Sequence, residues 1–177
     1  MEKYAWKLIG MLLFVALVSF FVTGPTNAWA RKKGSSLEQQ IQGTWKLVSI
    51  YNEQDGKKID VFGPNPRGVT IYTPDGHFSQ MLMNASLPKF ASNNRTKGTP
   101  EEYQAVGQGV ISYFGSYKVT NAKENMVSMH IEGSTFPNWD GVDQKRIITF
   151  SGDEMNVINP TPAIGGGTNY VVWKRVK

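Results

Sequence analysis

The residues of this chain best suited to chemistry lie on two expected strands, 126–133 and 145–151, and on the segment between them. His130 has the side chain of a general base, and Glu132 or Asp140 could orient it. Arg146 could stabilise an enolate or a carboxylate. Together these groups suit isomerisation or cyclisation of a small organic compound.

The same residues have a simpler interpretation. Side chains alternate along a strand, so 126–133 has one face with Ser128, His130 and Glu132 and another with Val127, Met129 and Ile131. On the next strand, Arg146 shares a face with Ile148 and Phe150. In the simpler interpretation, His130 makes one hydrogen bond inside a barrel and Arg146 pairs with Glu132 across the two strands. Spacing alone does not show that the catalytic candidates converge, so the simpler interpretation is favoured, and both remain open.

Other site chemistries have little support. There is no nucleophile elbow, phosphate loop or dinucleotide fingerprint. The run Gly165–Gly167 follows two prolines and is expected to be a flexible connection. Only His77 and His130 could supply nitrogen ligands, and cysteine is absent, so neither a metal nor another cofactor is expected.

Residues 1–30 have the pattern of a signal peptide. Lys3 and Lys7 precede an apolar run over 8–22, and Ala28-Trp29-Ala30 offers small residues where a signal peptidase cleaves. The run is shorter than the ~20 residues that span a bilayer. We expect cleavage after Ala30 and an exported protein, periplasmic or secreted, with no membrane span. The alternative is an uncleaved anchor, with the basic cluster 31–33 as its stop.

The remaining 147 residues, 31–177, suffice for one domain. Without cysteine the fold must depend on packing, for which nine Phe, seven Tyr and five Trp are available in the full chain. The formal net charge is +5 for the full chain and +4 without residues 1–30, and much of the positive charge lies at the ends of this domain. No basic stripe is interleaved with aromatic residues, so nucleic-acid binding is not expected. The oligomeric state is left open.

Short strands separated by tight turns predict an all-β fold. Turn signals lie at Asp55-Gly56, Pro74-Asp75-Gly76 and Ser151-Gly152-Asp153. Consecutive strands with short connections favour an up-and-down antiparallel barrel. The expected strands, about eight, are 44–51, 69–73, 77–83, 112–120, 126–133, 145–151, 154–159 and 169–176.

The first and last strands are neighbours in such a barrel. An indole at Trp45 could then be covered by the guanidinium of Arg175, with a helical turn over 37–42 plugging that end. The opposite mouth would remain for a ligand. In strand 112–120, Gly115 lies between Tyr113 and Tyr117 on one face, either to let the sheet bend or to leave room inside.

One short helix is expected within the series of strands. Thr99 is placed as its N-cap, Pro100 as its first residue, and Glu102 completes a capping box. Gly107 and Gly109 end it. A helix inserted here could serve as a lid over the barrel or as a structural brace.

Several motifs together resemble the bacterial and fungal lipocalin-like domain family. They are Gly43-Thr44-Trp45, Tyr72-Thr73-Pro74-Asp75-Gly76, Thr99-Pro100-Glu101-Glu102, Tyr113-Phe114-Gly115-Ser116-Tyr117, His130-Ile131-Glu132, Phe136-Pro137-Asn138-Trp139, Gly141, Gln144 and Arg146. The resemblance covers nearly all of 31–177. It implies a lipocalin-like barrel, and members of the family look like carriers of small organic molecules.

The resemblance also implies a site. It would turn seven residues toward one cavity mouth: Tyr113, Tyr117, His130, Asn138, Trp139, Gln144 and Arg146. This mixed lining suits a small apolar or aromatic ligand that is flat and partly polar. The expected function is therefore binding of such a ligand. The alternatives are a barrel enzyme with His130 as its base, and an envelope interaction protein with a packed interior.

Overall fold

The structure, a computed structural model, describes residues 35–177. The expected leader, 1–30, lies outside the described residues. In chain order the elements are α1 (Leu37–Ile41), β1 (Gly43–Gln54), β2 (Lys57–Ile59), β3 (Arg67–Tyr72), β4 (His77–Met83), α2 (Pro100–Gly109), β5 (Val110–Asn121), β6 (Met126–Ser134), the 3₁₀ turn η1 (Pro137–Trp139), β7 (Asp143–Ser151), β8 (Glu154–Asn159) and β9 (Thr168–Arg175).

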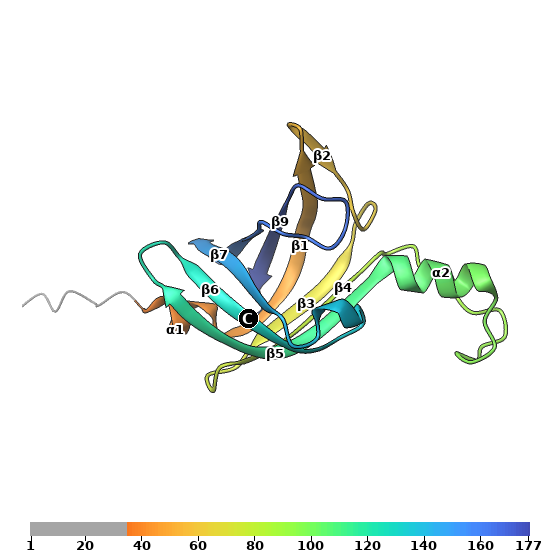
Figure 1. The fold of residues 1–177 in the computed structure, drawn as a ribbon, viewed down its shortest axis with the longest axis horizontal. Helices are drawn as coiled ribbons and strands as arrows, with labels where there is room; N and C mark the ends of the chain where they lie inside the picture. The colour runs from red at the N-terminus through yellow and green to blue at the C-terminus, as the bar shows by residue number, and fades with distance from the viewer. Residues whose placement is uncertain (1–34) are drawn as a thin grey trace, which may run out of the picture. The chain divides into compact units, whose positions relative to one another are not determined.

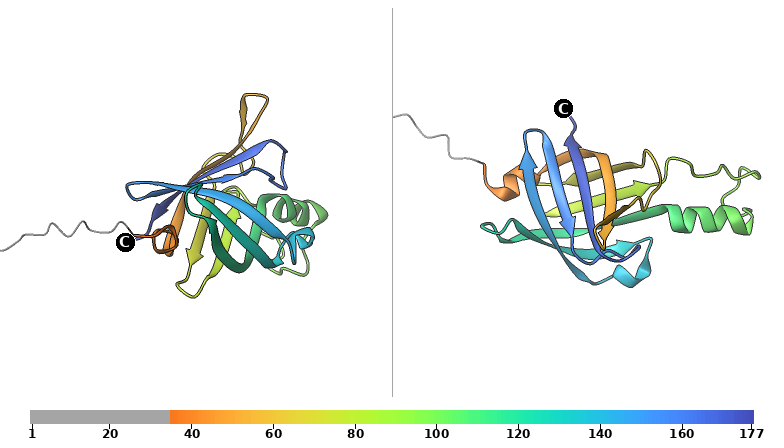
Figure 2. Two further views of the ribbon diagram at one scale, coloured as in Figure 1. Left: turned by 60° about the vertical axis from the view of Figure 1, so that its left-hand side comes forward. Right: turned by 90° about the horizontal axis from the view of Figure 1, so that it is seen from above.

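The strands form one antiparallel sheet that closes on itself. Each strand from β3 to β9 pairs with the next, and β1 pairs with both β3 and β9. Eight strands therefore complete an up-and-down barrel (Figures 1 and 2). This confirms the predicted fold class, and the tight turns allow the closure because they return each strand beside its predecessor.

The extra strand, β2, was not expected. β1 continues to Gln54 and pairs with β2 across a two-residue turn. Asp55 and Gly56 both have positive φ, 52° and 72°, as a type I′ hairpin turn requires.

One end of the barrel is sealed as the sequence predicts. The guanidinium of Arg175 lies 4.0 Å from the centre of the Trp45 ring, and Trp45 is 1% exposed. The Trp45 indole N–H donates to the Ile41 carbonyl at the end of α1, at 2.8 Å. A Cβ on Gly43 would lie 2.8 Å from an Arg175 nitrogen, which explains the glycine of the Gly-x-Trp motif.

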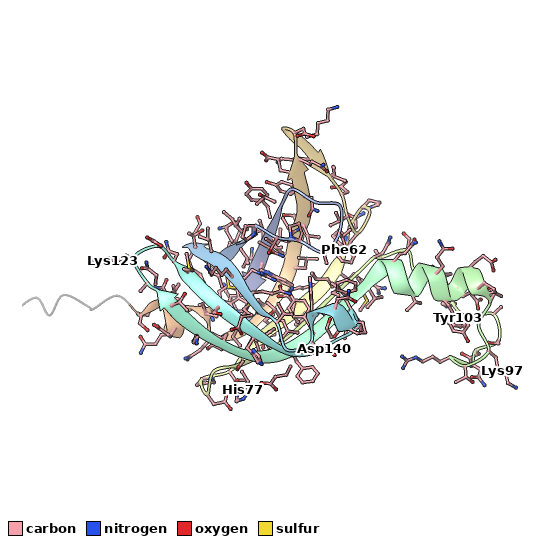
Figure 3. The ribbon with its side chains drawn as sticks, viewed as in Figure 1. Phe62, His77, Lys97, Tyr103, Lys123 and Asp140 are labelled. Carbon is pink, nitrogen blue, oxygen red and sulfur yellow. The ribbon has the colours of Figure 1, made fainter. Side chains whose placement is uncertain are left out.

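The α2 segment does not cover the barrel. Its capping box forms as predicted, with Thr99 and Glu102 bonded reciprocally. The helix projects beyond the barrel as a continuation of β5, and Tyr103 and Lys97 lie on this arm (Figures 1 and 3). Within the arm, the Tyr103 hydroxyl accepts from the Gly98 amide at 2.8 Å. The lid interpretation is therefore wrong, because α2 packs on the loop that precedes it.

Candidate functional site

The barrel contains a cavity that opens at the end opposite Trp45. The cavity volume is about 60 Å³. With the open space at its mouth included, the volume free of protein atoms is about 620 Å³. The cavity is therefore narrow. Most of its lining is apolar or aromatic, including Phe62, Leu82, Ile111, Met129, Trp139, Val157 and Trp173.

A loop between β8 and β9, residues 160–167, covers part of this mouth. Pro162, Ala163 and Ile164 line the cavity. The Asn52 side-chain amide, at the end of β1, donates to the carbonyls of Ile164 and Gly166, the latter at 3.0 Å. We call residues 160–167 the lid loop.

Glycine is required in this loop. Gly165, Gly166 and Gly167 all have positive φ, 75°, 69° and 69°. A Cβ on Gly167 would lie 2.2 Å from the Glu53 carbonyl oxygen. The run was expected to be a flexible connection, and in the structure the Asn52 side chain of β1 donates to the Gly166 carbonyl. Asn169, on β9, supports this by donating to Asn52 Oδ1 at 2.8 Å.

A second polar cluster surrounds Arg146 in the cavity wall. Arg146 is 3% exposed, and its guanidinium donates to Asn159 Oδ1 at 3.1 Å and to Gln144 Oε1. The Gln80 side-chain amide donates to the Tyr113 hydroxyl at 2.6 Å. Arg146, Asn159, Gln80 and Tyr113 all line the cavity.

Burial controls the ionisation of the cavity tyrosines. Loss of hydration raises the pKa of Tyr72 well above its ordinary value, and the neighbouring Tyr113 adds to the rise. Burial also raises the pKa of Tyr113, although the adjacent Arg146 charge opposes that rise. Both hydroxyls are therefore protonated at neutral pH and are available to donate hydrogen bonds.

Three of the seven predicted site residues line this cavity: Tyr113, Trp139 and Arg146. The Trp139 ring meets the Tyr113 ring edge-on, at 5.2 Å between centres. Gln144 is buried beneath this group and contacts Arg146, so it supports the cavity wall. Trp139 belongs to η1, the turn between β6 and β7 at the cavity mouth.

The other three predicted residues lie elsewhere. Asn138 is exposed on η1. Tyr117 is buried nearer the sealed end, where its hydroxyl donates to the Thr73 carbonyl at 3.0 Å. The structure corrects the expected position of His130, which lies on the outer face of the barrel because Met129 and Ile131 take the inner face.

His130 cannot reach a molecule inside the barrel. Its side chain is 48% exposed, and its Nδ1 lies 2.8 Å from Asp143 Oδ1. Glu132 is exposed on the same outer face, as the alternation predicts. The expected pair between Glu132 and Arg146 is therefore not formed, since the two side chains lie on opposite sides of the wall.

Gly115 lets β5 and β6 approach closely in the barrel wall, and it does not provide space in the cavity. A Cβ there would lie 1.9 Å from the His130 carbonyl oxygen. The pairing of β5 with β6 shifts between Phe114 and Gly115. The glycine thus permits a close approach of two backbones at a bulge, which supports the bending interpretation.

The buried asparagines were not predicted from the sequence. Asn159 and Asn169 follow the inward alternation of their strands, so that signal was available. Asn52 was concealed by a bulge, because the pairing of β1 with β9 shifts between Leu47 and Ser49. Val48 is the extra residue, and beyond it the even-numbered side chains point inward.

Two further searches cover the described part of the chain. Over residues 35–177, no group of three or more His, Cys, Asp or Glu side chains is placed to hold a metal ion. Among the helices of that same region, none is long and apolar enough to cross a membrane.

These features define a closed antiparallel barrel with an internal cavity. A lipocalin-like domain model matches residues 42–176. The chain therefore belongs to the lipocalin-like domain family, as the motifs predict.

The chain is similar to a named fungal protein and to a solved bacterial structure. A protein of Aspergillus oryzae named as a 4'-hydroxy-3'-methoxypropiophenone carrier protein is 24% identical over 106 residues, which cover 55% of this chain and 96% of that protein. A crystal structure of an uncharacterised protein from Bacteroides eggerthii is 17% identical, with a TM-score of 0.40, and the match covers 76% of this chain and 98% of the other.

Proposed function

We propose that this protein is an exported carrier that holds a small aromatic molecule in the barrel cavity. The observation that carries the proposal is the cavity, with apolar and aromatic walls and a few polar groups gathered at Arg146 and Tyr113. Ligand sites commonly combine such walls with a small number of placed polar groups. The name of the Aspergillus oryzae relative, the carrier of an aromatic ketone, supports the same class of ligand.

The narrowness of the cavity favours a flat ligand. Trp139 and Tyr113 present two rings at right angles, at 84° between planes. A flat ring can slide beside such a wall where a branched molecule of equal volume cannot. Entry would be controlled by the lid loop, which is held by hydrogen bonds from Asn52 and not by a packed core.

The chemistry of the lining favours binding over catalysis. Among the described residues, the cavity lining contains no Asp, Glu or His. Its titratable side chains are Tyr72, Tyr113 and Arg146. Tyrosines whose pKa is raised stay protonated at neutral pH and are therefore not available as general bases. The alternative isomerase or cyclase with His130 as base lacks support, since His130 lies outside the wall.

Native mass spectrometry of the protein purified from its own host tests the carrier proposal. We expect an additional small mass that is lost on mild denaturation. The same sample tests export, because cleavage after Ala30 gives a chain that begins at Arg31. Full-length mass in the envelope fraction would instead indicate an anchored form. Protein without bound mass that also fails to bind a panel of small aromatic compounds would contradict the carrier proposal.

A further inference from the structure

Arg146 is a buried cation whose protein partners are all uncharged. It is 97% buried and donates to the Lys145 carbonyl, Asn159 Oδ1 and Gln144 Oε1. These bonds use three of the five N–H groups of a guanidinium. Arg146 also borders the cavity, so an occupant of the cavity would lie beside this side chain.

No carboxylate neutralises Arg146 within residues 35–177. The ion pairs found there join exposed side chains, namely His77–Asp75, His130–Asp143 and Lys174–Asp153. A guanidinium keeps its proton in a protein, and burial of a charge without a counter-ion is costly. The cavity wall therefore holds a positive charge that no carboxylate among residues 35–177 compensates.

The Tyr113 hydroxyl adds a second donor beside Arg146. With the Gln80 amide oriented to donate to it, this hydroxyl keeps its own proton for another acceptor. No hydrogen bond from the Tyr113 hydroxyl to a residue of 35–177 is found. The Arg146 charge lies near enough to lower the Tyr113 pKa against the effect of burial. Two donors, one of them charged, thus meet in one part of the cavity, next to the Trp139 ring.

We propose that the cavity binds its aromatic ligand as an anion, with a phenolate or carboxylate oxygen that accepts from Arg146 and Tyr113. This proposal rests on the proposed carrier function and specifies its ligand class. The anion supplies the missing negative charge, while the aromatic ring occupies the apolar part beside Trp139. Hydrogen bonds between charged partners are shorter and stronger than neutral ones, so the ionised form should be selected over a neutral molecule of the same shape.

A matched pair of probes separates this proposal from the carrier function. 4-Nitrophenol ionises near neutral pH, whereas 4-nitroanisole has nearly the same shape and cannot ionise. We expect 4-nitrophenol to bind the purified protein at least about tenfold more tightly than 4-nitroanisole. At a pH where free 4-nitrophenol is half ionised, the visible absorbance of its phenolate should increase on binding.

The outcomes are distinct. Equal binding of both compounds, with bound 4-nitrophenol no more ionised than free, overturns the anion proposal and leaves the carrier function standing. Benzoate and benzamide repeat the comparison with a carboxylate. Failure of all four compounds to bind contradicts the carrier function for this ligand class, and the anion proposal with it.

Variants then assign the effect to Arg146. In Arg146→Met, the affinity for 4-nitrophenol should fall to that for 4-nitroanisole, whose own affinity should not change. Lys145→Met is the matched control, because it removes the same charge from the exposed neighbour on the same strand, and it should leave both affinities unchanged. If Arg146→Met does not fold, Tyr113→Phe provides the test through loss of the phenolate absorbance change.

Discussion

Arg175 at the sealed end of the barrel and Arg146 in the cavity wall have different surroundings. Arg175 lies over the Trp45 ring and donates to the carbonyls of Gln42 and Gln40, at 2.7 and 2.6 Å. Arg146 lies in the cavity wall and donates to the side-chain amide oxygens of Asn159 and Gln144. Arg175 is only partly buried, whereas Arg146 is almost completely enclosed.

The difference indicates separate roles. The two terminal nitrogens of Arg175 each donate to a backbone carbonyl, and its planar face lies over an indole. Arg175 is only partly buried, so solvent can hydrate the rest of its guanidinium. Arg146 is almost completely enclosed, donates to uncharged groups, and has no carboxylate partner among residues 35–177. One end of the barrel is therefore closed by Arg175, and the other carries the proposed ligand site at Arg146.

The largest expected effect concerns Trp45 at the sealed end. Trp45→Ala should lower the free energy of unfolding by about 3–5 kcal/mol, because it removes a fully buried aromatic ring and leaves a void. Urea unfolding measures this. A change below about 1 kcal/mol would mean that Trp45 is peripheral and that the sealed end does not depend on it.

Replacing each arginine by methionine tests whether Arg175 and Arg146 contribute differently to the free energy of unfolding. Arg175→Met should destabilise the protein by about 1–3 kcal/mol, since two charge-assisted hydrogen bonds to backbone carbonyls are lost. Arg146→Met should change stability by less than about 1 kcal/mol, because relief of a buried charge offsets the loss of a partner for Gln144. Equal destabilisation in thermal or urea unfolding would contradict the assignment of separate roles.

The tyrosines beside Arg146 predict a loss of stability in alkali. Unfolded tyrosine ionises near pH ~10, whereas burial keeps Tyr72 and Tyr113 protonated to higher pH. The folded state then binds more protons than the unfolded state, so stability is fully present below pH ~10 and falls above it. The slope reaches at most about 1.4 kcal/mol per pH unit for each tyrosine. Unfolding measured from about pH 9 to pH 11 should show less loss in Tyr72→Phe than in the wild type.

Substitution of Trp139 tests the proposed ligand site while Arg146 is left unchanged. Trp139→Ala should weaken binding of 4-nitrophenol and 4-nitroanisole alike by about tenfold, because one aromatic face contributes about 1–2 kcal/mol. Trp139→Phe should retain most of the affinity. Isothermal titration calorimetry gives both values. Unchanged affinity in Trp139→Ala would mean that the indole only caps the outer sheet.

Much of the sealed end could be predicted from the sequence, because its residues act through local patterns. The Gly-x-Trp motif, the capping signals and the strand alternation lead directly to Trp45 and Arg175. The open end was harder, since the inward position of Asn52 depends on a bulge at Val48 that no spacing reveals. The position of the lid loop depends on hydrogen bonds between segments more than a hundred residues apart.

His130 shows the opposite failure, in which the strand alternation was right and the expected inward position of His130 was wrong. The sequence places His130 opposite Met129 and Ile131, and those two are the core residues. The resemblance to a family nevertheless turned His130 toward the cavity together with Arg146. A residue that points inward must alternate in step with the buried apolar residues of its own strand. Arg146 does so with Ile148 on β7, whereas His130 lies between the buried Met129 and Ile131 on β6.

The smallest expected effect is that of His130→Ala. The imidazole and the Asp143 carboxylate are both exposed on the outer face, and exposed ion pairs contribute little to stability. We therefore expect a change in unfolding free energy within about 0.5 kcal/mol and unaltered affinity for 4-nitrophenol. Asp143→Asn is the matched control and should behave in the same way. Loss of ligand binding in His130→Ala, with folding intact, would place the recognition site on the outer face and would remove the contrast between the two arginines, since Arg146 would no longer border the ligand.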